Sequence, residues 1–134
     1  MQSLWVNKTQ ILRLILSIAW LIFIAVAMLT PGDKFPDANY FNFQDKVIHF
    51  ICFGLLSFLW CGVGINSKIS PKPRQRILIN YLIFGILAGI ILEILQRFVP
   101  FRTFDYMDMI VNEIGGLAGL VAYLKNPIKK FSLD

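Results

Sequence analysis

The sequence ILINYLIFGILAGIILEIL, residues 77–95, decides the fold, because it is long, almost wholly apolar and lacks the alternation of a half-buried strand. A helix needs about 20 such residues to cross the hydrocarbon core of a bilayer. Only helices and closed barrels satisfy their backbone hydrogen bonds in lipid. We therefore predict a membrane-spanning helix over this stretch.

Further stretches of the same kind lie on both sides of it, at residues 14–30, 47–65 and 106–124. Pro31, Pro71 and Pro100 mark the links between them. Because the links are short, consecutive helices are expected to run antiparallel. We predict an all-α fold, a four-helix transmembrane bundle that forms a single domain over residues 1–134.

The composition supports a lipid environment. Of the 134 residues, 57% are hydrophobic and 16% are charged, whereas soluble domains average about 45–50% and about 25%. A chain this short cannot bury the excess apolar surface in one core. These values exclude a cytosolic enzyme, a disordered tail and a disulfide-stapled secreted module, and they predict a multi-pass protein of the cell membrane.

Basic residues predict the orientation of the bundle. One side carries Lys8, Arg13, Lys68, Lys72, Arg74, Arg76, Lys125, Lys129 and Lys130, and the other carries Lys34, Lys46, Arg97 and Arg102. The positive-inside rule then places both termini in the cytoplasm, an N-in/C-in arrangement. The expected partners of these bases are anionic membrane lipids, and no nucleic-acid site is needed to explain them.

The first stretch has a second interpretation. Lys8 and Arg13 precede it, and Ala25-Val26-Ala27 near its end resembles a signal-peptide cleavage site. Because further spans follow and the stretch is long for a signal peptide, we expect an uncleaved helix.

Polar residues gather at the expected outer ends of three predicted helices and in the adjoining links. The candidate binding residues are Asp45, His49, Glu93, Gln96, Arg102, Asp105, Asp108 and Asn112. Ionisable groups in a membrane span are costly, and they are functional candidates for that reason. Helical spacing places Asp105, Asp108 and Asn112 within about 60° of one another. We predict a polar site just below the outer surface, in which Glu93, His49 and Asp108 are the candidate catalytic groups.

Glycine spacing predicts how two of the helices pack. Gly85-x-x-x-Gly89 and Gly115-x-x-x-Gly119 are spacings at which helix backbones approach closely. We expect these glycine faces to meet each other, which would bring the polar residues of the two helices together.

The polar motifs resemble those of one family. Asp45-Lys46-x-x-His49, Glu93-x-x-Gln96, Pro100-x-Arg102 and Asp108-x-x-x-Asn112 occur in the order and approximate spacing of the VanZ-like membrane proteins. The resemblance covers about residues 10–125. It implies a small multi-helix membrane protein, with a link to low-level resistance to the glycopeptide teicoplanin, but it implies no reaction.

The leading hypothesis is a site for an anionic lipid head group, a lipid-linked cell-wall precursor or a glycopeptide at the outer leaflet. Arg102 would anchor the head group, Glu93 and His49 would share a proton, and Asp108 with Asn112 would orient them. Two alternatives stay open. The same residues suit a membrane enzyme that performs acid–base chemistry on a head group, or they hold the helices together without binding a ligand.

Other kinds of site have weaker support. Metal binding by His49, Glu93, Asp105 and Asp108 is chemically allowed, but the chain has one histidine and no short ligand motif such as H-E-x-x-H, so we expect no metal and no cofactor. Ser57 lies too deep along the helix to serve as a nucleophile for His49. No phosphate-binding glycine loop occurs, and the sequence does not determine the oligomeric state.

Overall fold

The computed structural model describes residues 8–35, 41–65 and 72–125, and its regular elements in these ranges are all helices. Four helical segments are long and apolar enough to cross a membrane: α1 (Lys8–Leu29), α2 (Gln44–Cys61), the continuous run Pro73–Gln96 and α5 (Tyr106–Lys125). The predicted all-α, four-span architecture is confirmed. Most helix boundaries differ from the predicted ones by a few residues.

The third span is not one regular α-helix. It consists of α3 (Pro73–Asn80), the π-helical segment η2 (Tyr81–Leu87) and α4 (Ala88–Gln96). Pro73 occupies the first turn of α3, where its missing N–H removes no hydrogen bond. The π-helical segment was not predicted, because the apolar periodicity of the sequence does not distinguish it from an α-helix. Such segments are rare and occur frequently at functional sites.

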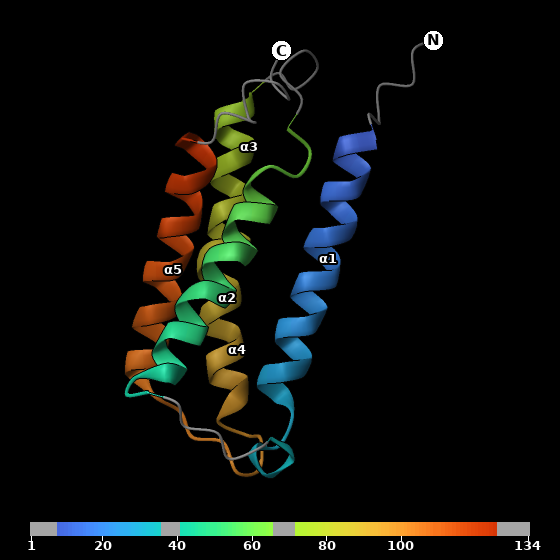
Figure 1. Cartoon of the computed structure of the whole chain (residues 1–134). Helices are drawn as coiled ribbons and strands as arrows, with labels where there is room; N and C mark the ends of the chain where they lie inside the picture. Colours follow the sequence, from blue (N-terminus) through green and yellow to red (C-terminus); the bar gives the residue numbers. More distant parts are fainter. Residues whose placement is uncertain (1–7, 36–40, 66–71, 126–134) are drawn as a thin grey trace.

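The helices form a bundle in which α2 lies between α1 and α5, with the third span behind it (Figure 1). The first turn of α1 and the last turn of α5 lie at the same end of the bundle (Figure 1). We call the opposite end the outer end, following the charge pattern. Whether it faces outward stays a prediction, and Lys68, Lys129 and Lys130 lie outside the described residues.

Two links meet at the outer end. The short 3₁₀ helix η1 (Gly32–Lys34) follows α1, and the N–H of Gly32 donates to the carbonyl oxygen of Pro100 at 3.1 Å. A Cβ atom at position 32 would collide with the backbone of Phe101. The link after α1 is therefore held directly against the link before α5.

Glycines allow α5 to pack closely on two neighbours. Gly115 and Gly119 face the backbone of α2, whereas Gly116 faces Gly85 in η2, and a Cβ on any of the three would collide with a carbonyl oxygen of the facing helix. The expected meeting of Gly85-x-x-x-Gly89 with Gly115-x-x-x-Gly119 is therefore wrong for the second motif. Two adjacent faces of α5 carry glycine, and the one containing Gly115 and Gly119 packs against α2.

Arg13 connects the other end of α1 to the bundle. Its Nε donates to the carbonyl oxygen of Leu59 at 2.8 Å, and its Nη2 donates to that of Phe58. The guanidinium also lies over the rings of Phe58 and Tyr123, 5.3 and 4.9 Å from their centroids. Because Phe58 and Leu59 are in the last turn of α2, Arg13 caps the C-terminus of that helix.

Candidate functional site

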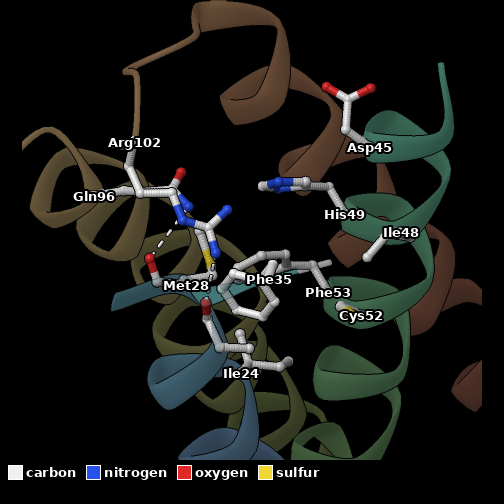
Figure 2. Close-up of a pocket in the computed structure, with 11 residues that line it drawn as sticks. Ile24, Met28, Phe35, Asp45, Ile48, His49, Cys52, Phe53, Gln96 and Arg102 are labelled. Atoms are coloured by element: carbon white, nitrogen blue, oxygen red, sulfur yellow. Dashed lines mark hydrogen bonds between the residues drawn. The ribbon is translucent and has the colours of Figure 1, made fainter. Parts of the chain in front are cut away.

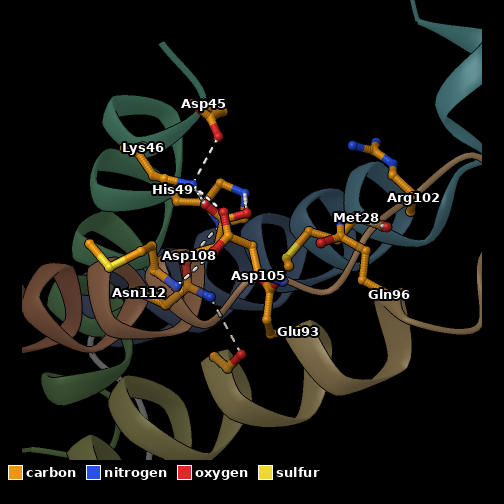
Figure 3. Close-up of polar contacts among 12 residues, drawn as sticks. Met28, Asp45, Lys46, His49, Glu93, Gln96, Arg102, Asp105, Asp108 and Asn112 are labelled. Carbon is orange, nitrogen blue, oxygen red and sulfur yellow. Dashed lines mark hydrogen bonds and ion pairs between the residues drawn. The ribbon is translucent and has the colours of Figure 1, made fainter. Parts of the chain in front are cut away.

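Lys46, near the start of α2, is the centre of an ion-pair network at the outer end (Figure 3). Its Nζ lies 2.7 Å from Asp105 Oδ2 and 3.1 Å from Asp45 Oδ2, and it also contacts Asp108 Oδ1. The Asp108 side chain is 11% exposed and that of Asp45 is 63% exposed. Lys46 was not among the predicted site residues, although a basic residue directly after Asp45, at an end of the bundle rich in acidic residues, could have indicated it.

Asp105 connects this network to α4 and to the start of α5. Its Oδ1 accepts a hydrogen bond from the Met107 N–H at 2.8 Å, as an N-cap residue does. Its own N–H donates to Glu93 Oε1 at 3.4 Å. The hydrogen bond from the Lys46 ammonium lowers the pKa of the Asp105 carboxyl.

Asn112 determines the orientation of His49. The Asn112 side chain is fully buried, and its Nδ2 donates to the carbonyl oxygen of Gly89 at 3.4 Å. Its Oδ1 therefore faces His49 Nδ1, at 2.8 Å, as an acceptor. This arrangement assigns a proton to Nδ1, so the neutral ring has its lone pair on Nε2, 3.9 Å from Asp108 Oδ2.

The expected proton-sharing pair of His49 and Glu93 is not seen among the hydrogen bonds of the described residues. Because α5 packs directly on α2, Asn112 reaches the imidazole, and Glu93 accepts from the Asp105 backbone instead. Glu93 is fully buried, and its Oε2 has no hydrogen-bond partner among the described residues.

Three of the predicted side chains lie together in spite of their separation in sequence. His49 of α2, Glu93 of α4 and Asp108 of α5 each offer one ligand atom, and these atoms all lie within 4.8 Å of one another. The geometry brings the candidate essential groups into one cluster. Their role stays a prediction.

A cavity of about 240 Å³ adjoins this cluster (Figure 2). Its apolar lining comes from α1, α2 and the link after α1, and the lining residues are Ile24, Ala27, Met28, Phe35, Ile48, Cys52 and Phe53. Its polar lining consists of Asp45, His49, Gln96 and Arg102. His49 belongs to both the cavity and the buried cluster.

Arg102 and Gln96 attach the outer end of α1. Arg102 donates from Nε to the carbonyl oxygen of Thr30 at 3.1 Å and from Nη2 to that of Ala27 at 2.9 Å. Gln96 donates to the carbonyl oxygen of Met28 at 3.2 Å. These bonds satisfy carbonyl groups that the end of a helix leaves without partners. Arg102, expected only as a head-group anchor, therefore has a structural contact as well.

The eight predicted residues thus form two adjoining groups. One group consists of the buried cluster of His49, Glu93 and Asp108 together with Asn112 and Asp105, which hydrogen-bond to it. The other group is the polar cavity lining, which contains Asp45, His49, Gln96 and Arg102.

Comparisons with known proteins find one matching family and a relative in yeast. The model of the VanZ/LLP1 family matches residues 7–129. The chain is also 30% identical over 116 residues to an uncharacterized protein of Schizosaccharomyces pombe, an alignment that covers 84% of this chain and 68% of the yeast protein. No solved structure matches the chain.

Proposed function

The chain belongs to the VanZ/LLP1 family, and from this premise we propose that it binds the phosphate-bearing head group of a membrane lipid in the cavity between α1 and α2. The observation that carries the proposal is the division of the cavity lining. Arg102 and His49 supply polar atoms, whereas Ile24 and Phe53 supply an apolar surface. A lining of this kind suits a molecule with a polar head and an apolar body.

Arg102 supports the recognition of phosphate. Its guanidinium lies over the Phe35 ring, 4.6 Å from the centroid. Two of its nitrogens donate hydrogen bonds to the carbonyl oxygens of Ala27 in α1 and of Thr30, which follows α1. These contacts fix the plane of the guanidinium. Nη1 has no hydrogen bond to a described residue, and guanidinium N–H groups pair well with phosphate oxygens.

Asp45 restricts the head groups that fit. Its carboxylate lines the same cavity and is largely exposed, so it would repel a head group with only negative charge. A head group that carries an amine beside its phosphate satisfies both Arg102 and Asp45. Ethanolamine phospholipids and amine-bearing lipid-linked cell-wall precursors share this chemistry.

The size of the cavity limits what it encloses. A volume of about 240 Å³ is below the range of about 300–1,000 Å³ that is typical of pockets for drug-sized ligands. The cavity therefore suits a head group and its nearest atoms, while the acyl chains stay in the bilayer. Resistance to teicoplanin would follow only if the ligand is a cell-wall precursor to which the antibiotic needs access.

The proposal is tested by native mass spectrometry of the purified protein with phosphatidylethanolamine, phosphatidylglycerol or a purified lipid-linked precursor. Ile48→Trp would fill the cavity, of which Ile48 is a lining residue. Ile51→Trp is the matched control, because Ile51 is similarly exposed on the same helix, 57% against 50%, and does not line the cavity. We expect Ile48→Trp to reduce bound amine-bearing lipid at least fivefold and Ile51→Trp to bind normally.

The arms of this experiment separate the two sources of ligand. Retention of phosphatidylethanolamine alone identifies a phospholipid, and retention of the precursor alone identifies the cell-wall intermediate. Equal binding of phosphatidylglycerol, equal binding by the two variants, or no binding by the wild-type protein would each overturn the proposal.

A further inference from the structure

The buried cluster of His49, Glu93 and Asp108 has the features of a metal-binding site. We propose that these three residues bind a divalent transition-metal ion, most readily Zn²⁺. Their ligand atoms come from three different helices and lie within 4.8 Å of one another. The proposal concerns the cluster alone and does not depend on lipid binding in the adjoining cavity.

Each of the three side chains is held through one atom while another stays available. His49 Nδ1 pairs with Asn112 Oδ1, Asp108 Oδ1 pairs with Lys46, and Glu93 Oε1 accepts from the Asp105 backbone. This leaves His49 Nε2, Asp108 Oδ2 and Glu93 Oε2 as the remaining donor atoms. Metal-binding histidines almost always donate their second ring N–H to a hydrogen-bond acceptor that fixes the ring, and Asn112 Oδ1 has that role here.

Glu93 gives an independent indication of a missing partner. Its side chain is 0% exposed, and Oε2 makes no hydrogen bond to any described residue. A buried polar atom without a partner costs free energy, and native proteins rarely leave one in that state. If Glu93 served only to hold the helices together, the hydrogen bond from Asp105 would explain the position of Oε1, but nothing would explain a buried Oε2 without a partner. Trp60 Nε1 and Glu113 Oε1 are also buried without a partner among the described residues, but only Glu93 lies beside two other ligand residues. A metal ion would supply the partner of Glu93 Oε2.

The charges around the cluster also favour a cation. Four carboxylates lie at the outer end of the bundle, those of Asp45, Asp105, Asp108 and Glu93. The Lys46 ammonium pairs with the three aspartates but not with Glu93. In addition, the Nε2 lone pair of a neutral His49 faces Asp108 Oδ2 at 3.9 Å. Two acceptors that face each other need a proton or a metal ion between them.

The spacing suits a metal after small movements. Zn–N and Zn–O bonds of about 2.0–2.2 Å place tetrahedral ligand atoms about 3.4 Å apart. The 3.9 Å separation of His49 Nε2 and Asp108 Oδ2 is close to this value. Rotation of the carboxylates about their side-chain bonds would shorten the longest separation in the cluster.

The ligand types indicate the class of metal. Imidazole favours Zn²⁺ and other late transition metals over Mg²⁺ and Ca²⁺, which prefer all-oxygen sites. Three protein ligands leave a fourth tetrahedral position open, as in catalytic rather than structural zinc sites. The expectation of no metal rested on the single histidine and on the absence of a short ligand motif. Here the candidate ligands are that histidine and two carboxylates that are distant from it in sequence.

The experiment uses the full chain, purified in detergent, stripped with chelator and dialysed against micromolar Zn²⁺. We expect about one Zn²⁺ per chain by elemental mass spectrometry, an increase in melting temperature with added Zn²⁺, and little change with Mg²⁺. Co²⁺ in place of Zn²⁺ should give the visible absorption bands of a four-coordinate site. Wild-type protein that stays folded but binds less than a tenth of an equivalent of Zn²⁺ would overturn the proposal without any variant.

Variants then locate the site. His49→Gln, Glu93→Gln and Asp108→Asn should each lower Zn²⁺ occupancy at least tenfold. Glu113→Gln is the control, because Glu113 also has a buried carboxylate oxygen without a partner among the described residues but lies outside the cluster and the cavity lining. Folded variants that keep full occupancy would refute the assignment. The metal is measured without added lipid. A failure to bind metal therefore leaves the lipid proposal intact, and a failure to bind lipid leaves the metal proposal intact.

Discussion

The Nδ1 atom of His49 lies 2.8 Å from the Oδ1 atom of Asn112, and this contact orients the imidazole between α2 and α5. The amide of Asn112 is itself fixed, because its Nδ2 donates to the Gly89 carbonyl oxygen on α4. One buried side chain therefore connects three helices and assigns the proton of the histidine. The orientation of His49 is consequently fixed by contacts within the protein.

Replacement of Asn112 should weaken the bundle. Asn112→Ala leaves the His49 Nδ1 without its buried acceptor, so we expect a loss of about 1–3 kcal/mol in the free energy of unfolding. Denaturant titration in detergent measures it. Ile110→Ala is the control, because Ile110 is 49% exposed on the same helix. Equal losses in the two variants would show that the hydrogen bond contributes nothing specific.

Lys46 should matter more for stability than the exposed carboxylate beside it. Lys46→Met leaves Asp108, 11% exposed, without its ion-pair partner, whereas Asp45→Asn removes only the pair with a carboxylate that is 63% exposed. Exposed pairs contribute about 0–1 kcal/mol. We expect a clear fall in melting temperature for Lys46→Met, a smaller one for Lys46→Arg and almost none for Asp45→Asn. The reverse order would contradict the central position of Lys46.

Much of this architecture was predictable because lipid simplifies the sequence signal. Long apolar runs identified the spans, and the cost of ionisable groups in a membrane singled out Glu93, His49 and Asp108 as candidates before their positions were known. The spacing of Asp108 and Asn112 on one face of α5 then placed a member of the buried cluster and the partner of His49 on the same helix.

Other features depended on which helix faces which. Asn112 rather than Glu93 reaches His49 because α5 packs directly on α2, and a single sequence does not contain that neighbour relationship. The same applies to Arg102, whose contact with the end of α1 requires the two outer links to meet. The π-helical turn Tyr81–Leu87 has no signature in apolar periodicity.

The glycine face between α5 and α2 gives a third prediction. Gly119→Ala would place a methyl group against the Gly54 carbonyl oxygen, and a helix backbone cannot move aside as a side chain can. We expect a loss of about 1–3 kcal/mol, which is the usual cost of overpacking. Ala122→Val, at an exposed position of α5, adds more volume and should cost little. Melting temperatures in detergent test the comparison, and a stable Gly119→Ala protein would argue against the close helix contact.

Arg13 and Arg102 allow stability to be separated from ligand binding. Each arginine donates from Nε and Nη2 to carbonyl oxygens at the C-terminus of a helix, Arg13 for α2 and Arg102 for α1. A lysine keeps the charge but loses the planar fork, so Arg13→Lys and Arg102→Lys should each lower the free energy of unfolding by about 1–2 kcal/mol. Their melting curves should therefore be similar.

Lipid binding should nevertheless distinguish the two variants. Arg102 lines the cavity, whereas Arg13 lies toward the other end of α1, so only Arg102→Lys should reduce the amount of amine-bearing lipid retained in native mass spectrometry. Equal lipid loss in both variants would mean that binding follows the stability of the bundle. In that case Arg102 would serve only to attach α1, and the head group would need a different anchor.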